Sequence, residues 1–190
     1  MPNDQPVEIA SLSKTLIHKG MVWDLVAETF EFNGQLLTRE YVDHTGAVAV
    51  LAFNEKEELL LMKQYRRPVG KFLMELPAGL LDVPGESKLD CAKRELAEEA
   101  GLEAASWSEL LSFHTTPGGN TEAISIFVAK ELSESKINFQ ATGEEVYMPK
   151  SWVPIDQAVK LVLSGKIMSP SAVVGIMAYQ LTKEANTTNK

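Results

Sequence analysis

The pattern of hydrophobic and polar positions divides the chain into an N-terminal group of short strands and a longer region of strands and helices. Residues 11–44 mix β-branched and aromatic residues with polar ones, and Asn33-Gly34 has the composition of a tight hairpin turn. The uninterrupted apolar run AVAVLAF, residues 47–53, predicts a strand that is buried on both faces. Further strands are predicted in LLLMKQYR, KFLMELPAG, SELLSFHTT, AISIFVAKEL and WVPI, with RPVGK as a loop.

Three segments have the pattern of helices. The first is expected to begin near Ser87, whose hydroxyl can cap the helix with Asp90 three residues later, and to end at Gly101. Its apolar positions form one stripe, which consists of Leu89, Ala92, Leu96 and Ala100. Residues 156–164 and 171–183 predict the other two helices. Residues 46–185 therefore predict an α/β fold, a mixed sheet with helices on its faces.

The N-terminal strands are too few to be stable alone. A small group of strands cannot bury enough apolar surface to form an independent core. We therefore expect residues 1–45 to be a β appendage that packs on the main domain, residues 46–190, or on a second subunit.

Composition narrows the class of protein. The chain has 190 residues and a net charge of −8, which argues against a broad nucleic-acid surface. Cys91 is the only cysteine, so no intramolecular disulfide can form, as is usual in a reducing cytoplasm. The sequence has neither a signal-peptide pattern nor an apolar run of transmembrane length. We expect a cytoplasmic protein without a nucleic-acid or membrane partner.

Candidate chemistry is concentrated in the stretch KRELAEEAGL. Glu95, Glu98 and Glu99 are spaced i, i+3 and i+4, so on a helix these like charges repel one another. Such faces are most often solvated surface, but the apolar stripe through Leu96 runs beside this one. The preceding loop, AGLLDVPGE, can bring backbone carbonyls and Glu86 toward the helix. Hard divalent cations require clustered oxygens, and a diphosphate can bridge such metals, so the stretch predicts a metal site.

A longer pattern resembles the Nudix box: Gly79-x6-Glu86-x7-Arg94-Glu95-Leu96-x-Glu98-Glu99-x-Gly101-Leu102, with one extra residue in the loop before Glu86. The segment QYRRPVGKFLMELPAGLLD, and Pro117 sixteen residues after Gly101, are similar to the ADP-ribose pyrophosphatase branch of that family. The loop LLDVPGE is similar to the actinobacterial type of these enzymes.

The resemblance implies a fold and a metal site. The fold would be a Nudix-type α/β/α sandwich with a mixed sheet, plus N-terminal antiparallel strands. The metal ligands would be Glu95 and Glu99, assisted by Glu98 and by the carbonyl of Ala78. The metal would be Mg²⁺, with Mn²⁺ as a substitute.

The resemblance also implies roles around the metal. Arg94 would orient the carboxylates, and Gly79 would allow the backbone to approach closely. Glu145 or Glu144 in GEEVYM would help to activate the attacking water, and Arg66 would contact the diphosphate.

Other candidate residues keep two interpretations. Trp23 can stack on an adenine or pack in a core or dimer interface. In PGGNTE, the residues Gly118, Gly119 and Glu122 can form a plain hairpin turn or bind substrate. Arg39 is more often a surface charge than a residue that reaches across a swapped dimer. Cys91 is expected to be an ordinary, partly buried thiol.

The function that the resemblance implies is Mg²⁺-dependent hydrolysis of ADP-ribose to AMP and ribose 5-phosphate by a homodimer formed through the N-terminal strands. One alternative is another substrate, such as GDP-mannose or a dinucleotide. A second is a non-catalytic domain that senses ADP-ribose, which is less favoured because all three helix carboxylates are present and no basic helix-turn-helix follows.

Overall fold

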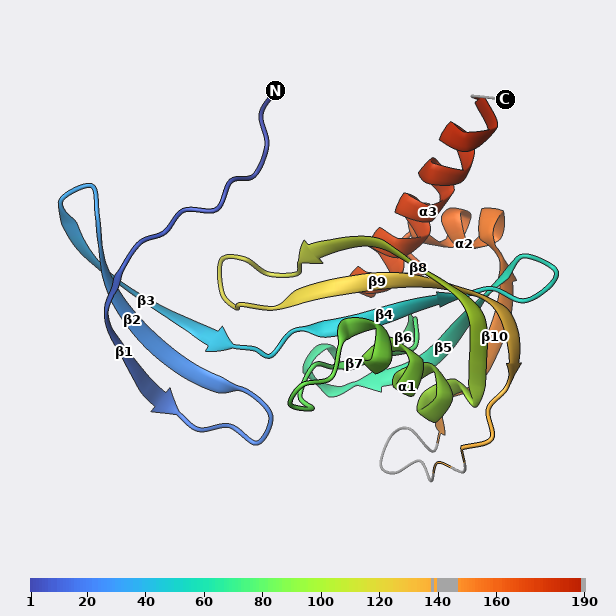
Figure 1. The fold of residues 1–190 in the computed structure, drawn as a ribbon, viewed down its shortest axis with the longest axis horizontal. Helices are drawn as coiled ribbons and strands as arrows, with labels where there is room; N and C mark the ends of the chain where they lie inside the picture. Colours follow the sequence, from blue (N-terminus) through green and yellow to red (C-terminus); the bar gives the residue numbers. More distant parts are fainter. Residues whose placement is uncertain (138, 140–146, 189–190) are drawn as a thin grey trace. The chain divides into compact units, whose positions relative to one another are not determined.

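The computed structural model describes residues 1–137, 139 and 147–188 of the chain (Figure 1). It divides into two compact units. We call Met1–Thr45 with His114–Glu122 the N-terminal unit, and Gly46–Phe113 with Ala123–Lys190 the main unit. No helix in the described part of the chain is long and apolar enough to cross a membrane.

The N-terminal unit is built on a three-stranded antiparallel sheet in the order β1-β2-β3. Its strands are β1 (Ser11–His18), β2 (Asp24–Phe32) and β3 (Gln35–Asp43). The turn at Asn33-Gly34 joins the last two, as the sequence predicted. Among residues 1–45, all of which are described, Val26 is the one buried residue. The sheet therefore has almost no core of its own within this chain.

The described part of the main unit forms two sheets. The larger has the order β7-β4-β9-β8, with β4 parallel to β9 and antiparallel to β7. Its strands are β4 (Ala47–Ala52), β7 (Ala78–Leu80), β8 (Leu102–His114) and β9 (Ala123–Glu134). The smaller is antiparallel in the order β10-β5-β6 and consists of β5 (Glu58–Arg66), β6 (Lys71–Glu75) and β10 (Lys150–Pro154).

In the described residues, three α-helices cover the sheets of the main unit (Figure 1). They are α1 (Lys88–Ala100), α2 (Ile155–Leu163) and α3 (Pro170–Thr188). Side chains of α2 and α3 share one hydrophobic cluster with Leu51 and Ile126, while α1 shares a second with Val50 and Phe127. Alternate residues of β4 point into the two clusters, so this strand is buried on both faces, as predicted. The predicted α/β/α sandwich is confirmed.

The predicted ends of α1 are confirmed by their hydrogen bonds. The Ser87 hydroxyl accepts a bond from the backbone N–H of Asp90 at 3.1 Å, which caps the first turn. Gly101 follows the last turn in the left-handed conformation, and its N–H bonds to the carbonyl of Ala97 at 3.0 Å.

Two local predictions were wrong. The segment KFLMELPAG is not one strand, because β6 joins the smaller sheet and β7 the larger one. Pro77, which has no N–H for a ladder, lies between them, and its carbonyl accepts a bond from Val50 N. The predicted loop RPVGK begins with a short 3₁₀ helix, η1 (Arg67–Val69), before Gly70 adopts the left-handed conformation.

Leu96→Ala tests whether α1 depends on the second cluster. Leu96 is fully buried, so removing its side chain leaves a cavity that should lower the free energy of unfolding by about 2–5 kcal/mol. Urea denaturation followed by circular dichroism measures this loss. Leu163→Ala, at an exposed position of α2, is the control and should change stability little. Equal stability for the two variants would contradict the assigned packing.

Candidate functional site

One guanidinium gathers the carboxylates of the predicted site. Arg94 Nε and Nη2 donate to the two carboxylate oxygens of Glu86 at 2.9 and 3.0 Å. Arg94 Nη1 donates to Glu95 Oε1 at 2.6 Å and to Glu98 Oε2 at 3.1 Å. The bidentate geometry makes the pair with Glu86 both strong and directional. Arg94 therefore fixes three acidic side chains from the loop and from α1.

The electrostatics of the cluster follow from these contacts. The hydrogen bonds from Arg94 hold the pKa of Glu86 below its usual value. Burial raises the pKa of Glu95, because removal from water disfavours its charged form more than the nearby guanidinium favours it. The carboxylates in turn raise the pKa of Arg94, so the guanidinium stays charged.

The backbone of β7 lies directly against two of the α1 carboxylates. A Cβ atom at Gly79 would lie 2.0 Å from both Cδ and Oε1 of Glu95, a separation that no real contact allows. The neighbouring backbone N–H of Ala78 donates to Glu99 Oε2 at 2.9 Å. Pairing of β7 with β4 holds this backbone in place. Any side chain at position 79 would therefore force either the Glu95 carboxylate or the backbone to move, because Glu95 occupies the space of a Cβ.

The donors at this site suit a hard divalent cation. Arg94 bonds to one oxygen of Glu95 and to one oxygen of Glu98, and carboxylate oxygens are the ligands that such cations prefer. Glu99 adds a third carboxylate from the same helix, one turn after Glu95. Among the described residues, no three His, Cys, Asp or Glu side chains already converge as a metal shell. These carboxylate oxygens are chemically suitable ligands for such a metal. In this structure Arg94 neutralises part of their negative charge.

Arg66, the predicted diphosphate contact, forms an ion pair within the smaller sheet. Its Nε and Nη2 donate to Glu75 Oε1 and Oε2 at 3.0 and 2.7 Å. Glu75 is buried and Arg66 is exposed, so the pair holds the guanidinium at the surface of the β5–β6 hairpin.

Several predicted substrate residues belong to the N-terminal unit. Trp23 stacks on His44 with ring centroids 5.2 Å apart, and His44 Nε2 lies 3.3 Å from Glu122 Oε1. Glu122 also accepts a hydrogen bond from the Thr115 hydroxyl. The structure thus brings together Trp23 and Glu122 through His44, an isolated histidine directly after β3 that the sequence did not single out.

The remaining predicted residues belong to the N-terminal unit or lie outside the described residues. Gly118 and Gly119 lie in the turn before β9, where Gly119 N bonds to Thr116 O at 2.9 Å. Arg39 on β3 donates to the carbonyl of its neighbour Thr38. The predicted bases, Glu144 and Glu145, lie outside the described residues.

Comparison with known proteins identifies the family. The family model of the NUDIX domain matches residues 43–170, which include α1 and the loop before it. The chain belongs to the Nudix family.

Several relatives of known name are similar over most of the chain. A protein of Mycobacterium tuberculosis named ADP-ribose pyrophosphatase is 37% identical over 90% of this chain and 83% of its own length. A protein of the same name from Bacillus subtilis is 36% identical over 94% of this chain and 96% of its own. A Bacillus methanolicus protein named methanol dehydrogenase activator is 36% identical over 87% of this chain and 89% of its own.

The solved structures support the fold independently. A crystal structure described as an ADP compounds hydrolase superposes with a TM-score of 0.79 and covers 97% of this chain and 98% of its own. At 20% sequence identity, this similarity establishes the fold alone.

The Nudix helix also carries the single cysteine, which is not a nucleophile in this structure. Cys91 is fully buried, and its thiol donates to the carbonyl of Leu80 at 3.4 Å. Burial raises the pKa of the Cys91 thiol to about 12, so the thiol stays protonated at neutral pH. The prediction of an ordinary thiol agrees with this environment, although the side chain is fully buried and not partly buried as expected.

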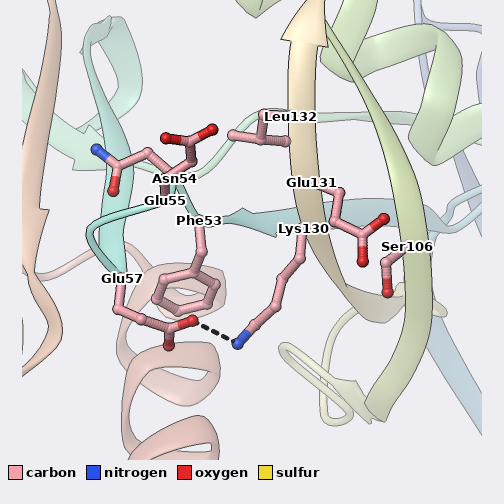
Figure 2. Close-up of a pocket in the computed structure, with 8 residues that line it drawn as sticks. All are labelled: Phe53, Asn54, Glu55, Glu57, Ser106, Lys130, Glu131 and Leu132. Carbon is pink, nitrogen blue, oxygen red and sulfur yellow. Dashed lines mark hydrogen bonds and ion pairs between the residues drawn. The ribbon is translucent and has the colours of Figure 1, made fainter.

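A separate hollow of about 430 Å³ lies elsewhere in the main unit (Figure 2). Its lining comes from the β4–β5 turn and from β8 and β9, and Lys130 forms an ion pair with Glu57 across it at 2.8 Å. None of the residues that the sequence predicted for the Nudix site lines this hollow. The hollow is therefore separate from the residues predicted for the Nudix site.

Gly79→Ala tests the contact between β7 and the Nudix helix. The added methyl group would overlap the Glu95 carboxylate, so either the backbone or Glu95 must move. We expect the affinity for Mn²⁺, measured by calorimetric titration, to fall by roughly 10–100-fold, as for other groups that orient metal ligands. The far-ultraviolet circular dichroism spectrum should stay unchanged. Wild-type affinity in a folded variant would show that Glu95 does not take part in binding.

Proposed function

We propose that this Nudix protein is an ADP-ribose pyrophosphatase that hydrolyses ADP-ribose to AMP and ribose 5-phosphate. The observation that carries the proposal is the placement of Glu95 against Gly79 with Arg94 bonded to three carboxylates. This arrangement matches what cleavage of a phosphoanhydride requires, since clustered oxygens can hold a cation against phosphate charge. The choice of ADP-ribose is supported by the two relatives that bear this name.

In the proposed mechanism the chain holds a cation and positions the groups around it. The metal ligands would be Glu95, Glu98 and Glu99, with the carbonyl of Ala78. Bound there, a divalent cation, which we propose to be Mg²⁺ with Mn²⁺ as a substitute, neutralises charge on the phosphate oxygens. Arg94 keeps the carboxylates in fixed orientations, so little reorganisation is needed when substrate binds.

The hydrolytic step breaks the diphosphate bridge by transferring one phosphoryl group to water. The water oxygen forms a bond to one phosphorus as the bridging oxygen leaves with the other phosphate, and a base accepts the water proton. We propose Glu145 or Glu144 as this base. Substrate contacts are proposed for Arg66 of the main unit and for residues of the N-terminal unit, namely Trp23, Arg39, Gly118, Gly119 and Glu122.

The assembly we propose is a homodimer in the cytoplasm, with residues 1–45 as the dimerising part and residues 46–190 as the Nudix hydrolase domain. The N-terminal sheet supports a dimer because it buries almost nothing itself and exposes several large apolar side chains, including Leu12, Leu16, Ile17, Val22 and Leu36. Exposed apolar surface of this kind usually marks an interface. The single cysteine agrees with a reducing compartment.

A phosphatase-coupled assay of phosphate release tests the substrate. ADP-ribose should be hydrolysed in the presence of Mg²⁺, faster than GDP-mannose, UDP-glucose or NADH, and EDTA should abolish the reaction. A preference for GDP-mannose would keep the diphosphate chemistry and reject ADP-ribose as the substrate. Failure to hydrolyse any of the four, with ADP-ribose still bound, would indicate a sensor instead of an enzyme.

Glu95→Gln tests the metal role directly. The amide keeps the size of the side chain but removes its charge, so kcat should fall by roughly 100-fold while the fold survives. Steady-state kinetics with ADP-ribose and circular dichroism measure both outcomes. Glu134→Gln is the control, because Glu134 is exposed at the end of β9. Wild-type kcat in the Glu95→Gln variant would reject this residue as a ligand.

A further inference from the structure

The last turn of α1 lacks the positive charge that helix C-termini favour. The aligned peptide dipoles give this end of a helix a partial negative charge, which nearby cations stabilise. Here the last turn contains Glu98 and Glu99 and no basic residue. The carboxylates therefore add negative charge at the end of the helix where it is least favourable.

The last carbonyls of the helix also need donors from outside it. Four carbonyls at a helix C-terminus have no partner within the helix. The N–H of Gly101 bonds to the carbonyls of Ala97 and Leu96, as is usual for a glycine cap. The carbonyl of Ala100 lies beyond the reach of this cap and requires another donor.

Lys150 supplies both the donor and the charge. Its Nζ donates to the carbonyl of Ala100 at 2.8 Å, fifty residues away in the sequence. The ammonium group also feels the charge of Glu99, which acts to raise the pKa of Lys150 against the larger, opposing effect of burial. Lys150 thus supplies the positive charge that the last turn of α1 lacks.

The strand that carries Lys150 is held firmly in the smaller sheet. Lys150 is the first residue of β10 and pairs with the buried Met62 of β5. The carbonyl of the preceding Pro149 accepts a bond from Lys63 N at 3.0 Å. The side chain therefore reaches α1 from a fixed point in the sheet.

A second strand ends at the same place. The N–H of Ser135, which directly follows β9, donates to the carbonyl of Gly101 at 2.9 Å. The Ser135 hydroxyl donates to Glu103 at 3.1 Å. Two consecutive carbonyls at the end of α1 thus accept hydrogen bonds from different sheets. The carbonyl of Ala100 bonds to the Lys150 side chain of the smaller sheet, and that of Gly101 bonds to the backbone amide of Ser135, which follows β9 of the larger sheet.

We propose that Lys150 is a positioning residue of the Nudix reaction, which holds the last turn of α1 and so the carboxylates of Glu98 and Glu99 in place for metal binding. The proposal rests on the function proposed above, because it assigns to that site a support that the Nudix box itself does not contain. Lys150 acts through the helix and does not touch the substrate.

Lys150→Met tests this role, since methionine keeps much of the aliphatic stem but removes the donor and the charge. We expect the dissociation constant for Mn²⁺, measured by calorimetric titration without substrate, to rise by about 10-fold. The value of kcat for ADP-ribose should fall by a similar factor, with KM changed less. Amide hydrogen exchange at residues 97–101 should become faster.

Two further variants separate positioning from general stability. Lys150→Arg restores a charged donor and should recover Mn²⁺ affinity and kcat to within about 3-fold of wild type. Lys160→Met removes an exposed lysine of α2 and should match wild type in Mn²⁺ affinity and kcat. If Lys150→Met lowers only the melting temperature, with Mn²⁺ affinity and kcat equal to those of Lys160→Met, the proposal is overturned.

Measurements on the wild-type protein distinguish failure of the proposed function from failure of the role proposed for Lys150. A wild type that hydrolyses ADP-ribose and binds Mn²⁺, together with an unaffected Lys150→Met variant, rejects Lys150 alone. A wild type that neither hydrolyses a diphosphate nor binds Mn²⁺ rejects the proposed function, and the role of Lys150 in it fails for that separate reason.

Discussion

The structure of the site depends on the contact between Arg94 and the carboxylates around it. Glu86 and Glu95 are mostly shielded from water, with side-chain exposures of 13% and 12%, so their mutual repulsion is screened far less than at an open surface. The guanidinium opposes this repulsion with four hydrogen bonds to three carboxylates. Without a cation at this position, the loop and the helix could not place their acids side by side. Arg94 thus allows the acids to lie close to one another.

The site is precise because its parts belong to rigid elements. Glu95 lies on a helix that is capped at both ends and packed through Leu96, while Gly79 lies on a strand paired with the fully buried β4. The close contact between the Gly79 backbone and the Glu95 carboxylate therefore links the buried strand β4 to the candidate site.

The features that were predicted correctly from the sequence are those that neighbouring residues determine. The caps at Ser87 and Gly101, the turn at Asn33-Gly34 and the burial of β4 all follow from neighbouring residues. The sequence did not predict the division of residues 71–80 between two sheets, because a short apolar run does not specify its partner strand. It gave no sign of the contact between Lys150 and Ala100, since an isolated lysine at the start of a strand resembles any surface charge.

The extra residue in the loop before Glu86 shows how a motif can tolerate a change in length. Val83-Pro84-Gly85-Glu86 forms a turn closed by a bond from Glu86 N to Val83 O at 3.2 Å. Proline at the second position and glycine with a φ of +81° at the third give the turn the geometry of type II. The side chain of Val83 is exposed, so the turn projects outward and absorbs the added length. Glu86 consequently still accepts hydrogen bonds from Nε and Nη2 of Arg94. This contact depends on where the turn ends and not on the number of residues within it.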